Sequence, residues 1–255
     1  TEAYYRKLPV LAITSHQGKD RIGQLIFQNI DRSNIPNDVA KLSVELPIIK
    51  DERDEAFVTM EANKAILELR RNGNGPVHIN IFTTYSRDFS IKEIPPVRVM
   101  KRIHAWDNMP KLPNGNICIY VGSHVHFSKE QEHAIDQFCG THDAIVICDH
   151  TSGYYGKYRL LPTLSQLQNA KSLFESFDLM IHIGEISAAT FAGTIPVKEI
   201  WRVSTDGELR DPFKKLSTVF QMPEEFFFKQ YSCENSNKHK NIDKSYYLIG
   251  DIYVK

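Results

Sequence analysis

Residues 116–149 read NICIYVGSHVHFSKEQEHAIDQFCGTHDAIVICD, and this stretch decides the fold class. The apolar runs at 116–122 and 143–149 are short and bounded by polar residues, which is typical of buried strands. Between them, the run at 128–139 opens on Ser128, a residue type that caps helix N-termini. A strand, a helix and a strand in this order predict two parallel strands joined by a crossover helix.

The same alternation continues toward the C-terminus. We expect a helix at 165–177, strands at 178–184 and 197–204, and a helix at 211–220 with Pro212 near its start. Together these elements predict a doubly wound α/β domain over residues 98–231. The polar residues 232–255 are expected to form a connection toward a further domain.

Toward the N-terminus the pattern predicts a second α/β domain. We expect strands at 8–14, 41–46 and 75–81, a short helix at 25–33, and an amphipathic helix at 51–72, which has acids in its first turn and basic residues before Gly73. Residues 1–82 therefore predict a mostly parallel sheet domain. The run 83–97 contains Pro95 and Pro96 and predicts an extended linker.

Composition excludes several classes of protein. Lys and Arg total 31, as do Asp and Glu, and this zero net charge gives no bulk attraction to nucleic acid or to an anionic membrane. No apolar run is long enough to span a bilayer. The four cysteines (118, 139, 148 and 233) show no metal or disulfide spacing, so we expect reduced buried thiols in a cytoplasmic protein. Apolar content of 42% is ordinary for a globular enzyme.

Four segments resemble thiamine-diphosphate-dependent enzymes of the acetolactate synthase group. They are TEAYYRKLPVLAITS (1–15), GKDRIGQLIFQNID (18–31), GNGPVHINI (73–81) and WRVSTDGELRDPF (201–213). The first three resemble the pyrimidine-binding domain, and the fourth resembles the end of the central domain. The Gly-Pro-Val-His run and the Asp-Gly-x-x-Arg-Asp run are similar to the menaquinone-pathway synthases, which join decarboxylated 2-oxoglutarate to isochorismate. The resemblance covers residues 1 to about 231.

This resemblance implies that the chain is a fragment, with an incomplete first domain. The family's glutamate that activates the cofactor would precede Thr1, and its Gly-Asp-Gly motif, which holds the diphosphate and Mg²⁺, does not occur in the sequence. The resemblance implies thiamine diphosphate and Mg²⁺ in the intact parent protein. We expect neither to bind this fragment, and we expect the fragment to be inactive, because the cofactor supplies the chemistry.

The resemblance also implies three site residues. Gln28 falls on the family's Phe-Gln pair, whose amide points into the active site, so it is the candidate catalytic residue, and a glutamine that faces solvent is the alternative. Phe27 would form an apolar wall against the substrate, and a core phenylalanine is the alternative. Arg210 matches a substrate-facing arginine, and its forked guanidinium suits a carboxylate, although a surface ion pair fits the same position. No cofactor-binding residue is assigned.

Two further motifs point to simpler roles. His124 and His126 are two apart in a strand-like stretch, but no third ligand is near, so we expect a structural pair and no metal. Gly122 and Gly184 follow strands and occupy the usual ligand position of doubly wound folds. The absence of a Gly-x-Gly-x-x-Gly pattern argues against FAD, the cofactor of acetolactate synthases in this domain.

We therefore expect the parent to be a carboligase or decarboxylase acting on a small 2-oxo acid, nearest to the menaquinone-pathway synthases. The family's architecture implies a homo-oligomer, a dimer or a tetramer. An acetolactate synthase-like enzyme is an alternative, although the run FTTYS at 82–86 replaces the lysine that those enzymes place there. The rival class is a non-catalytic two-domain α/β ligand-binding module.

Overall fold

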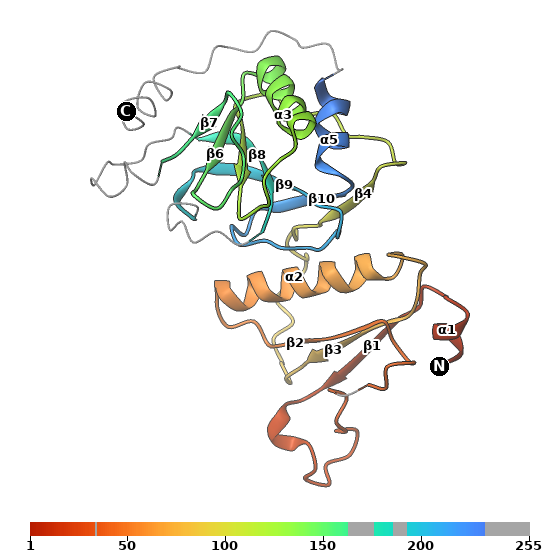
Figure 1. Ribbon diagram of the computed structural model, residues 1–255. Coiled ribbons are helices and arrows are strands. Elements are labelled where there is room, and N and C mark those ends of the chain that lie inside the picture. Colours follow the sequence, from red (N-terminus) through yellow and green to blue (C-terminus); the bar gives the residue numbers. More distant parts are fainter. Residues whose placement is uncertain (34, 163–175, 186–192, 233–255) are drawn as a thin grey trace. The chain divides into compact units, whose positions relative to one another are not determined.

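A computed structural model describes residues 1–33, 35–162, 176–185 and 193–232 (Figure 1). The chain divides into two compact units, Thr1–Val99 and Met100–Lys255, named unit 1 and unit 2. Each unit contains one sheet of parallel strands, with three strands in unit 1 and seven in unit 2. The predicted α/β class with two mostly parallel sheets is confirmed. Across these described ranges, no helix has the length and apolar character needed to cross a membrane.

Unit 1 is a three-stranded parallel sheet in the order β1-β3-β2, with a long helix on one face (Figure 1). Its core lies between that helix and the sheet and contains Val44, Leu46, Ala65, Val77 and Ile79. The three strands predicted for this region and the helix predicted at 51–72 are confirmed, with ends shifted by a few residues. The elements are α1 (Glu2–Tyr5), β1 (Leu11–His16), the 3-10 helix η1 (Lys19–Arg21), β2 (Leu42–Leu46), α2 (Glu52–Glu68) and β3 (Val77–Phe82).

Helix α2 begins at a side-chain cap. Asp51 accepts hydrogen bonds from the backbone N–H groups of Arg53 (2.8 Å) and Asp54 (3.0 Å), which satisfies donors that the first turn leaves free. Acidic residues in that turn also favour the positive end of the helix dipole. The local sequence therefore fixes where the helix that closes the unit 1 core begins.

The short helix predicted at 25–33 is wrong. Leu25 and Gln28 have φ values of 57° and 62°, in the left-handed region that a right-handed helix does not contain. Asp31 then accepts hydrogen bonds from the backbone N–H (2.9 Å) and the hydroxyl (2.6 Å) of Ser33, so its side chain stabilises a turn. The apolar spacing of LIFQNI suggested a helix, but its side chains are mostly exposed.

Unit 2 is a seven-stranded, fully parallel sheet in the order β4-β10-β9-β8-β5-β6-β7. Strands β8 and β5 lie in the middle, and strand order reverses around them, as in doubly wound folds. Residues 83–97, which the sequence predicts to be an extended linker, precede this unit and contain no helix or strand. The elements are β4 (Lys101–His104), β5 (Ile117–Val121), α3 (Lys129–His142), β6 (Ile145–Cys148), β7 (Arg159–Leu160), β8 (Phe177–Ile183), β9 (Val197–Val203), β10 (Leu216–Gln221) and α5 (Glu224–Ser232).

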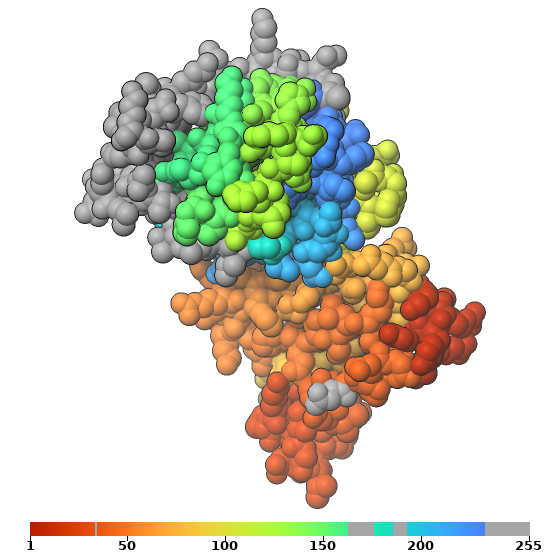
Figure 2. All heavy atoms as spheres, in the orientation of Figure 1, coloured from red at the N-terminus to blue at the C-terminus, as the bar shows by residue number. Residues whose placement is uncertain are grey.

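Helices α3 and α5 cover one face of this sheet and lie side by side on the surface seen in Figure 2. Phe138 of α3 meets Phe228 of α5 edge-on, with ring centroids 5.3 Å apart. Beneath them, Ile119, Ile181 and Val203 continue the core across the central strands. The sequence analysis missed α5, although Pro223 and the two glutamates in the first turn of the run EEFFFKQYS are helix-start signals.

The N-terminus of α3 carries a complete capping box. The Ser128 hydroxyl accepts from the Gln131 backbone N–H at 3.2 Å, and the Gln131 side chain accepts from the Ser128 N–H at 2.8 Å. The predicted Ser128 cap is confirmed.

Ser128→Ala is expected to reduce the free energy of unfolding by about 1 kcal/mol, because the N3 donor loses its partner. Ser128→Asp keeps an acceptor and serves as the matched control. Chemical denaturation followed by circular dichroism measures both variants, and equal stability of the alanine variant and the wild type would contradict the prediction.

The helix predicted at 211–220 is also wrong. Asp211 accepts hydrogen bonds from the backbone N–H groups of Lys215 (2.8 Å) and Leu216 (3.0 Å), which closes a turn, and Lys214 has a left-handed φ of 58°. From Leu216 the chain enters β10 between β9 and β4. A buried position between two strands suits Val219 and its β-branched and aromatic neighbours better than a helix. The helix predicted at 165–177 lies almost wholly outside the described residues, as do residues 233–255; Phe177 already belongs to β8.

Candidate functional site

The carboxyl edge of the unit 2 sheet carries a cleft of about 670 Å³. Ser123 follows β5, Glu185 follows β8 and Ser204 follows β9, so three neighbouring strands each contribute a wall. Glu224, the first residue of α5, lines the opposite side. Ligands of doubly wound folds bind outside the carboxyl ends of the strands, and this volume is typical of small-molecule sites.

Two glycines let the ends of β5 and β8 approach each other closely. A Cβ atom on Gly122 would lie 2.1 Å from the Glu185 carbonyl oxygen, and Gly184 has a left-handed φ of 76°. The Glu185 N–H donates to the Ser123 carbonyl at 2.8 Å. These glycines therefore set the position of Glu185 at the cleft, where the sequence predicted a ligand position.

Four charged side chains form one network beside this cleft. Glu185 bridges two arginines: its Oε1 lies 3.1 Å from Arg202 Nη2, and its Oε2 lies 2.5 Å from Arg210 Nη1. Asp206 Oδ2 lies 3.5 Å from Arg202 Nη2 and 3.7 Å from Arg210 Nη2. Burial alone raises the pKa of Asp206, but hydrogen bonds within its loop and the charges of both arginines outweigh it and lower that pKa. The network therefore holds two positive and two negative charges.

Arg202 enters this network from inside the sheet. It lies on β9 with its side chain 1% exposed, and its Nε and Nη1 atoms have no hydrogen-bond partner in the described part of the chain. His182 is its neighbour on β8, and both of its ring nitrogens are similarly unpartnered. Burial and then the charge of Arg202 lower the pKa of His182 to about 4, so this ring is neutral near pH 7. The rings of Tyr120 and Phe213 pack against His182.

His124 and Glu224 both line the cleft and form an ion pair when His124 is protonated. His124 Nε2 lies 3.4 Å from Glu224 Oε2, and its Nδ1 lies 2.7 Å from the Val125 carbonyl oxygen. Burial lowers the pKa of His124, but the interaction with the Glu224 carboxylate outweighs burial and raises the pKa above its ordinary value of 6.5. The pair joins the loop after β5 to the first turn of α5.

Glu224→Gln is expected to lower the pKa of His124, measured from its NMR titration. The raised folded-state pKa means that the stabilisation is fully present below about pH 6.5 and is lost as the pH rises through the folded pKa. The variant should therefore lose more stability at pH 6 than at pH 9. Glu225→Gln is the matched control, because Glu225 pairs with Lys229 in the same helix. An unchanged His124 titration in the Glu224 variant would contradict this assignment.

The two histidines predicted as a structural pair have separate surroundings. The residues around them form no strand, which corrects the expectation of a strand-like stretch. The His124 ring stacks on Phe127 at 4.1 Å, whereas the exposed His126 ring stacks on Tyr155 at 5.6 Å. The described ranges contain no cluster of three His, Cys, Asp or Glu side chains that could hold a metal ion.

In unit 1, Gln28 and Phe27 lie in the segment that follows β1. Gln28 is exposed, and its φ of 62° is a strained backbone for a residue other than glycine. Phe27 is 80% exposed, so it is not a core residue of this chain. Arg210 lies in unit 2, whereas Gln28 and Phe27 lie in unit 1. Their roles stay predictions.

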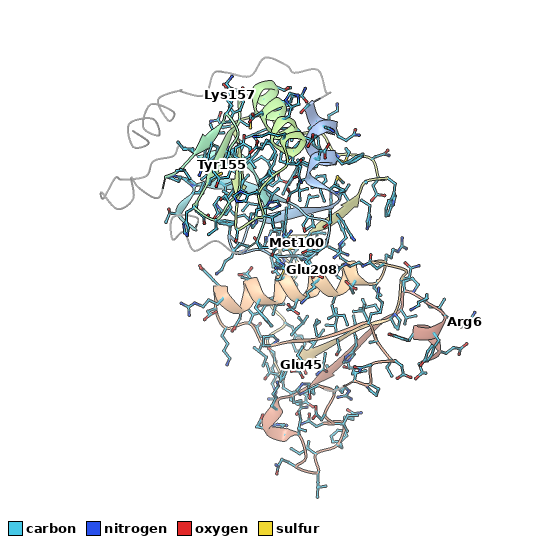
Figure 3. The ribbon with its side chains drawn as sticks, viewed as in Figure 1. Arg6, Glu45, Met100, Tyr155, Lys157 and Glu208 are labelled. Atoms are coloured by element: carbon cyan, nitrogen blue, oxygen red, sulfur yellow. The ribbon has the colours of Figure 1, made fainter. Side chains whose placement is uncertain are left out.

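The same segment covers part of the sheet face that points away from α2. Lys19 reaches Glu45 of β2 at 2.9 Å and lies over the Phe82 ring of β3; Figure 3 labels Glu45 at this sheet. Asn29 and Asn80 are buried, and neither side-chain nitrogen has a partner within the described residues. Unit 1 therefore buries polar side chains both in the segment after β1 and on β3.

The Gly-Pro-Val-His motif contributes a residue that joins all three strands of unit 1. His78 Nε2 lies 2.7 Å from Thr14 Oγ1 of β1, and His78 Nδ1 lies 2.8 Å from Ser43 Oγ of β2. Thr14 in turn donates to Asn80 Oδ1 at 2.9 Å. Burial, helped by the charge of Arg32, lowers the pKa of His78, so the bridge is made by a neutral ring near pH 7.

The chain is similar in sequence to two curated synthases. A 2-succinyl-5-enolpyruvyl-6-hydroxy-3-cyclohexene-1-carboxylate synthase of Bacteroides thetaiotaomicron is 28% identical over 254 residues, covering 89% of this chain and 44% of the synthase. The synthase of the same name from Phocaeicola vulgatus is 28% identical over 281 residues, covering all of this chain and 48% of its own length. The predicted resemblance is confirmed. This chain spans less than half of the length of these synthases.

No family model matches the chain. One solved structure that aligns with the chain is described as the X-ray structure of a thiamin diphosphate-dependent enzyme from Mycobacterium smegmatis. The alignment covers 94% of this chain and 48% of the chain in that structure, with 14% sequence identity and a TM-score of 0.28. The similarity to the synthases is therefore the comparison that informs the function.

Sequence reasoning identified Arg210 and the two glycine positions of the cleft but missed Arg202, His182 and Glu224. A signal for Arg202 was present, because a charged residue inside the apolar strand run VKEIWRVS demands a buried partner. Glu224 could have been found only by recognising the start of α5.

Proposed function

We propose that this chain is part of a thiamine-diphosphate-dependent carboligase or decarboxylase that acts on a 2-oxo acid and is similar to 2-succinyl-5-enolpyruvyl-6-hydroxy-3-cyclohexene-1-carboxylate synthases. The observation that carries the proposal is the similarity to those synthases over 89% to 100% of the chain. Two parallel α/β units in the expected order support it. Buried unpaired thiols at Cys118, Cys139 and Cys148 support a cytoplasmic protein.

The carboxylate chemistry of the proposed substrate matches the charge network of unit 2. Arg210 is the predicted substrate-binding arginine, and its guanidinium already binds a carboxylate oxygen of Glu185 at 2.5 Å. Forked guanidinium groups recognise carboxylates through paired hydrogen bonds. In unit 1, the exposed amide of Gln28 is free to reach a substrate oxygen or a reacting intermediate. These two residues are the proposed substrate contacts from this chain.

The resemblance assigns the diphosphate and Mg²⁺ to a Gly-Asp-Gly motif, and this motif does not occur in the sequence of this chain. Mg²⁺ at a diphosphate is usually bound through one or two carboxylates together with the phosphate oxygens, which is the role that such a motif would supply. Thiamine diphosphate supplies the electron sink for breaking and forming carbon–carbon bonds next to a carbonyl. We assign its binding to a protein that contains this chain together with a Gly-Asp-Gly segment.

The test is an assay of that intact protein. With thiamine diphosphate and Mg²⁺ present, it should release CO₂ from 2-oxoglutarate or another 2-oxo acid and form a carbon–carbon bond when isochorismate is added. Product analysis by mass spectrometry distinguishes this from acetolactate formation from pyruvate. An absence of turnover with all tested 2-oxo acids would contradict the proposal and favour a non-catalytic ligand-binding module.

For the 255-residue chain alone, titration calorimetry with thiamine diphosphate and Mg²⁺ is expected to show no micromolar binding. The physical reason is the missing set of oxygen ligands for the ion-bound diphosphate, which carries most of the cofactor's charge. Circular dichroism of the same sample verifies that the titrated chain is folded. A micromolar dissociation constant would show that this chain holds a complete cofactor site.

A further inference from the structure

Glu185 occupies the space between two arginines in the way that a bound carboxylate would. One oxygen of its side chain pairs with Arg202 Nη2 at 3.1 Å, and the other pairs with Arg210 Nη1 at 2.5 Å. The same residue lines the unit 2 cleft, and its side chain is 47% exposed. Glu185 can therefore turn out of the network through the cleft without crossing the core.

We propose that the unit 2 cleft binds a small carboxylate ligand, which displaces Glu185 from Arg202 and Arg210. The inference deepens the proposed function, because it names the residues that hold the acid group and the internal residue that competes with it. It rests on that function only for the expected ligand class, a short 2-oxo acid. Binding itself requires neither the cofactor nor turnover.

The unmet hydrogen-bonding capacity of Arg202 favours the exchange. Glu185 and Asp206 reach only its Nη2 atom, while Nε and Nη1 are buried without a partner among the described residues. Glu185 is tethered to the end of β8, and its two oxygens are already divided between the two arginines. A free ligand is not tethered, so it can orient its oxygens toward the guanidinium donors that become accessible when Glu185 leaves.

Charge balance also favours a single carboxylate. When Glu185 turns toward solvent, Asp206 is the one carboxylate among the described residues that still pairs with Arg202 and Arg210, so these three side chains carry a net positive charge. One ligand carboxylate restores neutrality. Glu224 lines the same cleft, and its carboxylate pairs with His124 when that ring is protonated.

The neutral walls of the cleft indicate what accompanies the carboxylate. Ser204 and Thr205 follow β9 and line the same cleft as Glu185. Their hydroxyl groups can donate to an oxygen on the carbon next to the acid group. A 2-oxo or 2-hydroxy acid therefore fits the lining better than a simple fatty acid.

The test is a calorimetric titration of the purified 255-residue chain with 2-oxoglutarate and pyruvate, in the absence of thiamine diphosphate. Pyruvamide, which lacks the charge, and inorganic phosphate are the comparison probes. Glu185→Gln is expected to tighten 2-oxoglutarate binding about tenfold, because it weakens the internal competitor. Arg210→Gln is expected to weaken binding about tenfold, because it removes one of the two anchors. Lys198→Gln is the matched control, since Lys198 pairs with Asp178 at the amino end of the strands.

The sign of the Glu185 effect decides the outcome. If Glu185 merely stabilised the loop or bound the ligand directly, Glu185→Gln would leave binding unchanged or weaken it, and either result would overturn the proposal. Binding that survives Arg210→Gln, or phosphate binding as tight as that of 2-oxoglutarate, would also overturn it. A chain that behaves as expected here, while the intact protein shows no turnover, contradicts the proposed function and leaves the carboxylate site intact.

Discussion

Gln28→Ala is expected to slow the carbon–carbon step of the intact enzyme about 10- to 100-fold while leaving its melting temperature unchanged. A hydrogen bond to a charged or reacting group contributes about 1.5–3 kcal/mol, and each 1.36 kcal/mol corresponds to a tenfold change in rate. Because Gln28 is exposed in this chain, removal of its amide should alter the stability by less than about 0.5 kcal/mol. Single-turnover kinetics and thermal unfolding measure the two quantities separately.

Two further variants make this test specific. Gln24→Ala removes an exposed glutamine from the same segment and should leave the rate unchanged. Gln28→Gly suits the left-handed backbone, with its φ of 62°, so it should fold at least as well as the wild type and should be as slow as the alanine variant. A wild-type rate in Gln28→Ala would mean that the amide touches neither the substrate nor an intermediate.

The sequence was most informative where local and tertiary preferences agree. The strand at 116–122 and the capped helix that begins after Ser128 are buried on the sides that their patterns predict. The pattern failed at 211–220, where the turn closed by Asp211 and the pairing of β10 with two strands outweigh a helical spacing of apolar residues. It failed at 25–33 because residues with a positive φ interrupt that segment, and the spacing of apolar residues does not reveal the sign of φ.

The candidate site was predictable only in part, for a related reason. Arg210 could be identified from its motif, and the two glycines from their positions after strands. The ion-pair network that surrounds them could not be predicted, because Glu185 follows β8 and Arg202 lies on β9. These two residues meet only when β8 and β9 are paired. Site residues that depend on strand order, and not on local spacing, require the topology first.

The purified 255-residue chain is expected to form a two-fold dimer through β1. This strand lies at the edge of the described unit 1 sheet, paired only with β3. Leu11 and Ile13 share a face with the core residues Val77 and Ile79 in the strand register, but α2 packs over β2 and β3, so Ile13 is left 60% exposed. An open edge with exposed apolar side chains favours strand pairing, and two-fold symmetry is the commonest way to close it.

Light scattering coupled to size-exclusion chromatography tests this expectation. At high concentration, the molar mass measured by light scattering for the wild-type chain should be twice the 29.3 kDa of one chain. The Ile13→Lys variant should give the mass of the monomer. A lysine at an edge opposes pairing because the approaching partner would bury its charge. Ile94→Lys is the matched control, since Ile94 is also exposed but lies outside every strand. A wild-type monomer, or a dimer that Ile13→Lys leaves intact, would mean that the β1 edge needs no partner and that the family's assembly depends on other surfaces.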